Sequence, residues 1–150
     1  MLIKISHRGN IWGPDSAYGE NSPMSIDLAI AYGYLCEVDL WLDGGLFLGH
    51  DRPEYQIDER WLKERAKLLY IHAKSLATLN WLLGSEYNYF WHENDKFTLT
   101  SDNKIWTYPG NEVTGNSIIV CRDENETKEY LEKNLYGVCS DYLLYLDLYM

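Results

Sequence analysis

The stretch LCEVDLWL, residues 35–42, decides how the rest of the sequence is interpreted. Successive side chains of a strand point to opposite faces, so Glu37 and Asp39 share one face and the intervening apolar residues share the other. Two adjacent carboxylates repel each other, and burial raises their cost further unless a cation lies between them. We interpret the pair as ligands of a divalent ion, for which oxygen ligands favour Mg²⁺, Ca²⁺ or Mn²⁺. The alternative is an edge strand whose two acids face water.

Length and composition predict a folded domain that spans residues 1–150. The chain is 46% apolar and 24% charged with four prolines, which is typical of a globular protein. No run approaches the roughly 18 uninterrupted apolar residues of a membrane span. The first residues, MLIKISHRGN, lack the apolar core of a signal peptide. We therefore expect no membrane span and a cytoplasmic location.

The charge balance limits the partners. The 13 basic and 23 acidic residues give a net charge of −10, which repels a nucleic-acid backbone. A small anionic substrate would need a metal ion or a few well-placed cations. The three cysteines, Cys36, Cys121 and Cys139, lie in apolar runs without metal-like spacing, and we expect them to pack in the core.

Strand and helix patterns alternate along the chain. Strands are predicted over residues 2–6, 35–42, 46–50, 68–73, 87–92, 117–121 and 136–142, with a further hairpin over 97–110. Helices are predicted over residues 22–33, 59–66, 75–84 and 125–134. This alternation favours an α/β fold with a mainly parallel sheet.

Histidines stand where several of these strands end. His7 follows the first strand, His50 ends the hairpin after residues 35–42, and His72 shares a face with Lys74 near the end of the next strand. One such histidine is more often a packing or surface residue. Several together indicate a site, because reacting groups collect at the carboxyl ends of parallel strands.

Short motifs occur in a fixed order between residues 3 and 51. They are His7-Arg8-Gly9, Glu20-Asn21-Ser22, Glu37-Val38-Asp39 followed by Asp43-Gly44, and His50-Asp51. The set resembles the signature of the glycerophosphodiester phosphodiesterase family: HRG, ENT, ExD with a DG turn, and HD. LYIHAKS (residues 69–75) resembles the third strand of that family, and YGVCSDY (residues 136–142) resembles its terminal GxxTDYP. The family belongs to the phosphatidylinositol-phospholipase-C-like phosphodiesterases, which have a TIM barrel.

The resemblance implies an acid-base pair and two phosphate-binding cations. His7 and His50 would be the pair, one deprotonating the attacking oxygen and the other protonating the leaving alcohol, a task that suits imidazole. Arg8 and Lys74 would hold the phosphate oxygens. Gly9 would let the backbone turn away, so that His7 projects over the barrel mouth.

The resemblance also implies one divalent metal ion. Glu37 and Asp39 would ligate it, with Glu20 at or next to its shell. His72 stands where the family usually has a glutamate ligand. Mg²⁺ or Ca²⁺ is the first expectation, and the neutral imidazole makes Mn²⁺ or Zn²⁺ an alternative.

A full barrel of this type takes about 250 residues. This shorter chain, with at most seven core-strand candidates and about four helices, predicts a reduced or incompletely closed TIM-type barrel of mainly parallel strands. Asp141, in the terminal motif, would lie at the site rim. Trp106, where a strand enters a turn, would lie at the rim or in the core.

Two functions are compatible with these residues. The first is metal-dependent hydrolysis of a small, glycerophosphodiester-like phosphodiester. Residues 51–60 are too few for the insertion that covers the glycerol in many family members, so the alcohol is left open. The alternative is a relative that binds a phosphorylated ligand without turnover. The histidine pair favours catalysis, because binding alone needs no acid-base couple.

Overall fold

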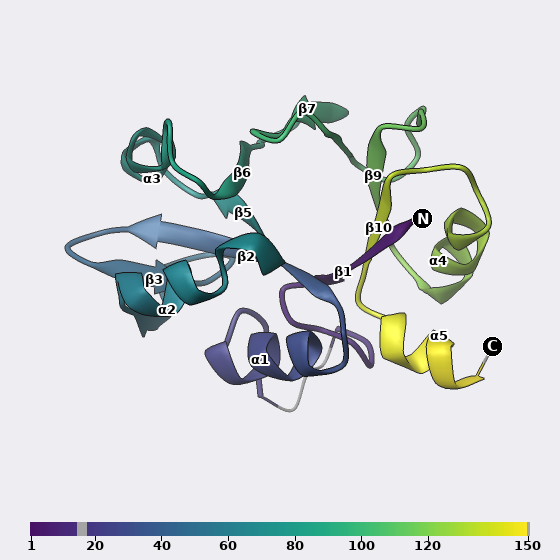
Figure 1. Ribbon diagram of the computed structural model, residues 1–150, viewed down its shortest axis with the longest axis horizontal. Coiled ribbons are helices and arrows are strands. Elements are labelled where there is room, and N and C mark those ends of the chain that lie inside the picture. Colours follow the sequence, from purple (N-terminus) through teal and green to yellow (C-terminus); the bar gives the residue numbers. More distant parts are fainter. Residues whose placement is uncertain (15–17, 150) are drawn as a thin grey trace.

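A sheet that curls around on itself dominates the computed structural model of the chain (Figure 1), which describes residues 1–14 and 18–149. Its strands are β1 (Ile3–His7), β2 (Leu35–Leu42), β3 (Leu46–Leu48), β4 (Tyr55–Ile57), β5 (Leu69–Ala73), β6 (Asn88–Trp91), β7 (Phe97–Leu99), β8 (Ile105–Thr107), β9 (Ser117–Val120) and β10 (Gly137–Ser140). The helices are α1 (Pro23–Ala31), α2 (Glu59–Glu64), α3 (Leu76–Leu82), α4 (Glu124–Leu131) and α5 (Leu143–Tyr149), with a 3₁₀ turn at Ala66–Leu68.

Seven of the described strands pair in parallel, in the order β6-β5-β2-β1-β10-β9-β8. β7 is antiparallel to β8 at one end of this series. No ladder joins β7 to β6 among the described strands, and the Ser101 backbone N–H instead donates to the Tyr89 carbonyl at 2.9 Å. The sheet is therefore an incompletely closed TIM-type barrel of mainly parallel strands, which confirms the predicted fold class.

Three elements differ from the sequence prediction. β4 pairs with β3 to extend a hairpin outside the barrel, and α5 follows β10; neither was predicted. β3 also ends at Leu48, two residues before the expected end at His50.

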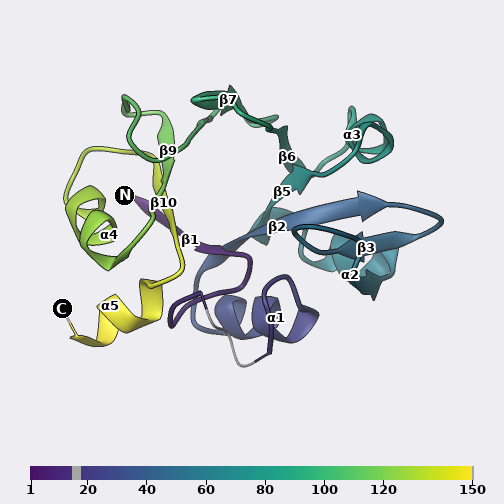
Figure 2. The ribbon, with the colours of Figure 1, turned by 180° about the vertical axis from the view of Figure 1, so that it is seen from behind.

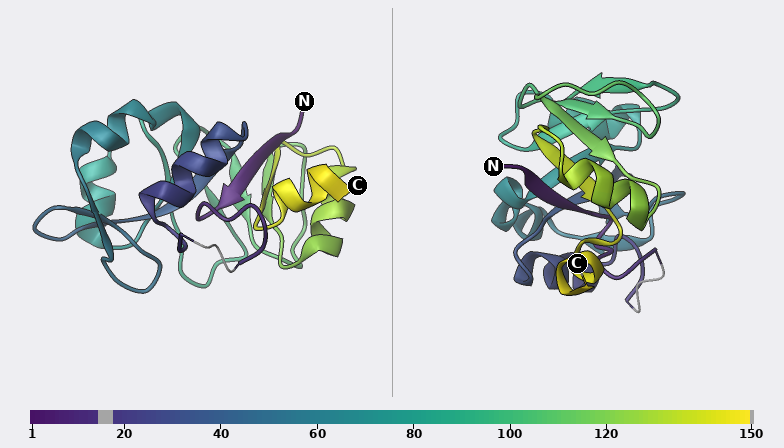
Figure 3. Two further views of the ribbon diagram at one scale, coloured as in Figure 1. Left: turned by 90° about the horizontal axis from the view of Figure 1, so that it is seen from below. Right: turned by 90° about the vertical axis from the view of Figure 1, so that its right-hand side faces the viewer.

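The helices lie outside the curled sheet (Figures 1 and 2). α1 and α3 pack on β2, and α4 packs on β10. Seen from below, α1 and α5 lie on either side of β1 (Figure 3, left). No described helix has both the length and the apolar character needed to cross a lipid bilayer.

Large side chains fill the barrel interior. This cluster contains Ile5, Tyr70, Phe90, Trp106, Ile118, Val120 and Cys139. The rings of Phe90 and Trp106 stack with centroids 4.5 Å apart, and Trp106 is 1% exposed. Because aromatic rings occupy the middle of the barrel, polar groups gather at one end of it.

Candidate active site

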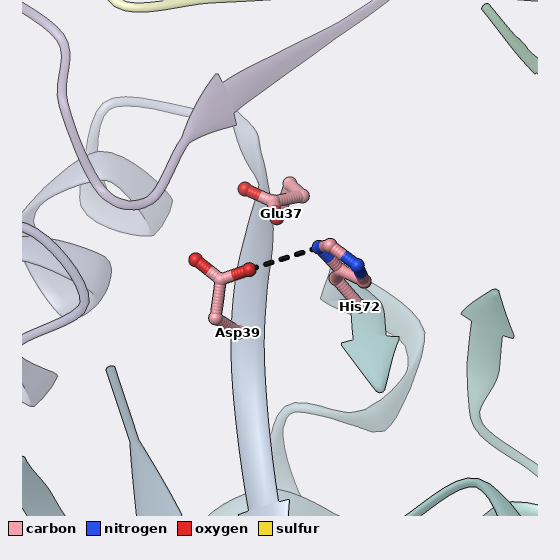
Figure 4. A group of neighbouring side chains, drawn as sticks. All are labelled: Glu37, Asp39 and His72. Atoms are coloured by element: carbon pink, nitrogen blue, oxygen red, sulfur yellow. Dashed lines mark ion pairs between the residues drawn. The ribbon is translucent and has the colours of Figure 1, made fainter. Parts of the chain in front are cut away.

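Glu37 and Asp39 of β2 and His72, the next-to-last residue of β5, come together on one face of the sheet (Figure 4). One potential ligand atom from each residue lies within 4.8 Å of the other two, and all three residues are buried. Asp39 stands opposite His72 in the parallel ladder, with Oδ1 3.0 Å from His72 Nδ1. The predicted juxtaposition is confirmed. The edge-strand alternative is wrong, because β2 lies between β1 and β5.

The donor atoms of this group fit a metal ion. Glu37 Oε2 and Asp39 Oδ1 are buried without a hydrogen-bond donor within the described part of the chain. His72 Nε2 lies 3.3 Å from the carbonyl oxygen of His92. With an ion bound, Nε2 would donate its proton to this carbonyl, and Nδ1 would offer its lone pair to the ion. Two buried carboxylate oxygens beside an imidazole nitrogen are a suitable set for a divalent cation.

The two carboxyl groups differ in their affinity for a proton. Burial, together with the charge of Asp39, raises the pKa of Glu37 to about 7. Burial acts in the same direction on Asp39, but His72 and the Arg8 guanidinium outweigh it and hold the pKa of Asp39 well below its usual range. The pair therefore carries less than two negative charges near neutral pH until a cation binds.

Residues in left-handed backbone conformations support this group. Asn21 (φ +62°) donates from Nδ2 to Asp39 Oδ2 at 2.9 Å, and its Oδ1 accepts from the Asp39 backbone N–H at 2.9 Å. Arg8 (φ +59°) lies with Nε 3.3 Å from Asp39 Oδ2. Gly9 (φ +84°) follows, and a Cβ there would lie 2.9 Å from the Cβ of Ser25. Such strained residues concentrate at functional sites.

Glu20 does not join the three-residue group. Its carboxylate lies 3.2 Å from Arg8 Nη1 and accepts from Asn10 Nδ2 at 3.0 Å. Asn10 is fully buried and also donates to Asp141 Oδ1 at 3.0 Å. Glu20 as a metal ligand therefore stays a prediction. No role was predicted for Asn10 or Asn21, although each lies within or next to a motif.

His7 and Asp141 form a dyad across the β1–β10 ladder. His7 Nδ1 lies 3.0 Å from Asp141 Oδ1, and His7 Nε2 lies 3.9 Å from Glu37 Oε2. Burial by itself lowers the pKa of His7, but the hydrogen bond to Asp141 and the charge of Glu37 raise it above its usual value. Burial raises the pKa of Asp141, and the bond with His7 more than offsets this and lowers it. Asp141 is thus at the predicted end of the barrel.

His50 carries a second histidine–aspartate contact, with Nδ1 2.8 Å from Asp51 Oδ1. Its side chain is 40% exposed, so it lies at the mouth of the site. Lys74 Nζ lies 4.0 Å from Asp39 Oδ1 on the same side. The structure therefore brings both predicted histidines and both predicted cations to the end of the barrel that holds Asp39.

Two adjoining cavities open at this end. The inner cavity, about 120 Å³, is lined by His7, Arg8, Glu37, His50, His72, His92, Trp106, Tyr108 and Val120. The outer cavity, about 460 Å³, is lined by Trp41, His50, Asp51, His72, Ala73, Lys74, Trp91, His92 and Glu93. All four histidines of the sequence line the inner cavity.

His92 and Tyr108 were not predicted from the sequence. Their rings stack with centroids 3.5 Å apart, and burial, with the nearby charge of His72, lowers the pKa of His92. His92 could have been found, because it follows β6 as the other histidines follow their strands. Tyr108 likewise directly follows β8, but with 13 tyrosines in the sequence its position alone does not single it out. Trp106 is both a core residue and part of the cavity wall.

No protein-family model matches the chain, and no curated protein sequence matches it either. Among solved structures, the chain is similar to the glycerophosphodiester phosphodiesterase from Agrobacterium tumefaciens str. C58. The TM-score is 0.61 at 13% sequence identity, and the match covers 96% of this chain and 98% of the other. The chain therefore shares the fold of a protein of the kind that its motifs resemble.

Proposed function

We propose that the protein is a metal-dependent hydrolase of a small, glycerophosphodiester-like phosphodiester, with His7 and His50 as the acid-base pair. The observation that carries the proposal is that both histidines and the metal-fitting residues Glu37 and His72 line a single small cavity. The shared fold with a glycerophosphodiester phosphodiesterase supports it.

Glu37, Asp39 and His72 would hold one divalent ion. When bound, such an ion acts as a Lewis acid on the phosphoryl group and offsets the charge of the transition state. The two carboxylates suit Mg²⁺ or Ca²⁺, and His72 makes Mn²⁺ or Zn²⁺ an alternative. Arg8 and Lys74 add fixed positive charge for the phosphate oxygens in a protein whose net charge is −10.

The two histidines have different surroundings. His7 lines the inner cavity and is paired with Asp141, so we assign it as the base that removes the proton from the attacking hydroxyl. That oxygen, from water or from a neighbouring substrate hydroxyl, forms a bond to phosphorus as the bond to the leaving alcohol breaks. His50 lines both cavities and faces the route of departure, so we assign it as the acid that gives the leaving oxygen its proton.

The test is a panel of small phosphodiesters assayed with Mg²⁺, Ca²⁺, Mn²⁺ and Zn²⁺ in parallel. H7Q and H50Q should each lower kcat by about a hundredfold or more, the size expected for general acid-base catalysis, while metal affinity changes little. D39N should abolish metal dependence. The matched control is D43N, which removes an exposed carboxylate from the turn that follows the same strand and should leave turnover unchanged.

Calorimetric titration with metal and with a phosphodiester separates the proposal from its alternative. Suppose the metal-loaded protein binds phosphodiesters but turns none over, and H7Q and H50Q alter only affinity. The protein would then be a phosphate-binding relative, and the hydrolase assignment would be abandoned.

A further inference from the structure

Trp41 links β2, the strand that bears Glu37 and Asp39, to the loop that carries His50. It lies two residues beyond Asp39 on β2, on the same face as Glu37 and Asp39. Its indole Nε1–H donates to the carbonyl oxygen of Gly49 at 2.7 Å, and Gly49 directly precedes His50. The Gly49 backbone N–H donates in turn to the Asp39 carbonyl at 3.1 Å.

The loop that begins at Gly49 is compact. The Glu54 N–H donates to the Leu48 carbonyl at 3.0 Å and closes the loop on itself. A Cβ at Gly49 would lie only 2.0 Å from the carbonyl oxygen of Arg52, which shows how tightly the loop folds back. Because a compact loop moves as a unit, its attachment to β2 decides where His50 lies.

Beyond the paired strands β3 and β4, two hydrogen bonds attach this loop to β2. The β2–β3 ladder ends at the Leu40–Leu48 pair, so the Gly49 carbonyl lies beyond the last paired residue of β3. Trp41 supplies the donor that this carbonyl would otherwise lack. The side-chain bond and the Gly49–Asp39 backbone bond together fix the residue before His50 to the strand that bears the candidate metal ligands.

We propose that Trp41 is a positioning residue for His50: its indole N–H holds the Gly49 carbonyl and so keeps the imidazole over the leaving group. This inference rests on the proposed function, in which His50 protonates the leaving alcohol. A displacement of about 1 Å in a catalytic group can cost on the order of a hundredfold in rate. Trp41 therefore has a role beyond forming the wall of the outer cavity.

Trp41→Phe removes the indole N–H and keeps an aromatic ring. The substrates are two glycerol phosphodiesters, one with p-nitrophenol and one with a primary alkyl alcohol as the second alcohol. p-Nitrophenol departs as a stable phenolate and needs no proton, whereas an alkoxide does. W41F should lower kcat about tenfold or more on the alkyl ester and much less on the p-nitrophenyl ester. H50Q should show the same selectivity.

The matched control is Trp91→Phe, because Trp91 lines the same outer cavity and is far from Gly49 in the chain. If W91F lowers kcat, it should lower it by the same factor on both esters. The double variant W41F/H50Q should be no slower on the alkyl ester than H50Q alone, because Trp41 acts through His50. Far-UV circular dichroism and metal affinity establish that each variant is folded, and W41Y replaces W41F if the latter does not fold.

The role of Trp41 would be overturned if W41F lowered kcat by the same factor on both esters, or if W41F/H50Q were slower on the alkyl ester than H50Q alone. Either result would leave the proposed function intact. A metal-loaded wild-type protein that hydrolyses neither ester would overturn the proposed function, and the role of Trp41 with it.

Discussion

The His7–Asp141 contact joins residues 134 positions apart and sets the protonation of the proposed base. The hydrogen bond and charge of Asp141 help to raise the pKa of His7 above its usual value of 6.5. In Asp141→Asn the pKa of His7 should therefore fall. Because the base must be unprotonated to act, the acid limb of the kcat/KM profile should move to lower pH. NMR titration of the histidine rings should show the same fall directly.

The stability of the same variant provides an independent check. A pKa raised in His7 and lowered in Asp141 means that the pair stabilises the fold at pH 5, where the histidine is charged and the aspartate ionised. This stabilisation is lost as the pH rises through the pKa of folded His7. The unfolding free energy of D141N should thus fall further below that of the wild type at pH 5 than at pH 9. An unchanged His7 titration in D141N would contradict the dyad.

At the scale of elements, β2 contributes side chains to both faces of the barrel wall. Its inward residues are the candidate ligands and Trp41, and its outward residues Cys36, Val38 and Leu40 are fully buried in the outer core that includes residues of α1 and α3. A one-residue change of register would exchange these two sets. The apolar packing of one face therefore fixes the position of the carboxylates on the other.

One carboxylate of the last helix, α5, links the helix to residues at and near β1. Asp147 accepts hydrogen bonds from Lys4 Nζ at 2.7 Å and from the Tyr34 hydroxyl. Tyr34 is 6% exposed, so Asp147→Ala leaves its hydroxyl without this acceptor. We expect D147A to lower the free energy of unfolding by about 1–3 kcal/mol, measured by urea denaturation.

The control is Glu129→Ala, which removes an ion pair with Lys133 whose two side chains are 61% and 43% exposed. Such a surface pair contributes about 0–1 kcal/mol. If D147A cost no more than E129A, the attachment of α5 would depend on its apolar contacts and on the hydrogen bonds from its backbone to Ile11.

At the scale of the whole molecule, the buried acid pair should oppose folding when no metal is bound. Because the pKa of Glu37 rises from 4.5 to about 7, its ionisation costs folding free energy that accumulates as the pH rises through this interval. At pH 8 and in EDTA, we expect Glu37→Gln to be more stable than the wild type by on the order of 1–3 kcal/mol. For a chain of this size, each kcal/mol of unfolding free energy changes the Tm by about 2–4 °C.

Saturating metal should raise the Tm of the wild type, because a ligand that binds only the folded state stabilises it, and should raise that of E37Q much less. The control E112Q removes an exposed carboxylate and should behave as the wild type does. A wild-type Tm that is the same in EDTA and in each of the four metals would contradict the metal site.

Local pattern alone determined much of this molecule. Alternation in residues 35–42 placed Glu37 and Asp39 on one face, and turn and cap residues predicted the helix that the structure has at Pro23–Ala31. Strand ends placed His7, His50 and His72 at one end of the sheet. These predictions succeeded because side-chain periodicity and capping depend on neighbours in the chain.

Only the tertiary structure decided which of these groups meet. β4 has three residues and α5 is mostly apolar without a predicted cap, so neither had a clear local signal. The pairing of His7 with Asp141 and the stacking of His92 on Tyr108 depend on strand order and on how far the sheet curls. The physical reason is that periodicity fixes the face on which a side chain lies, whereas register and closure between distant strands fix what it faces.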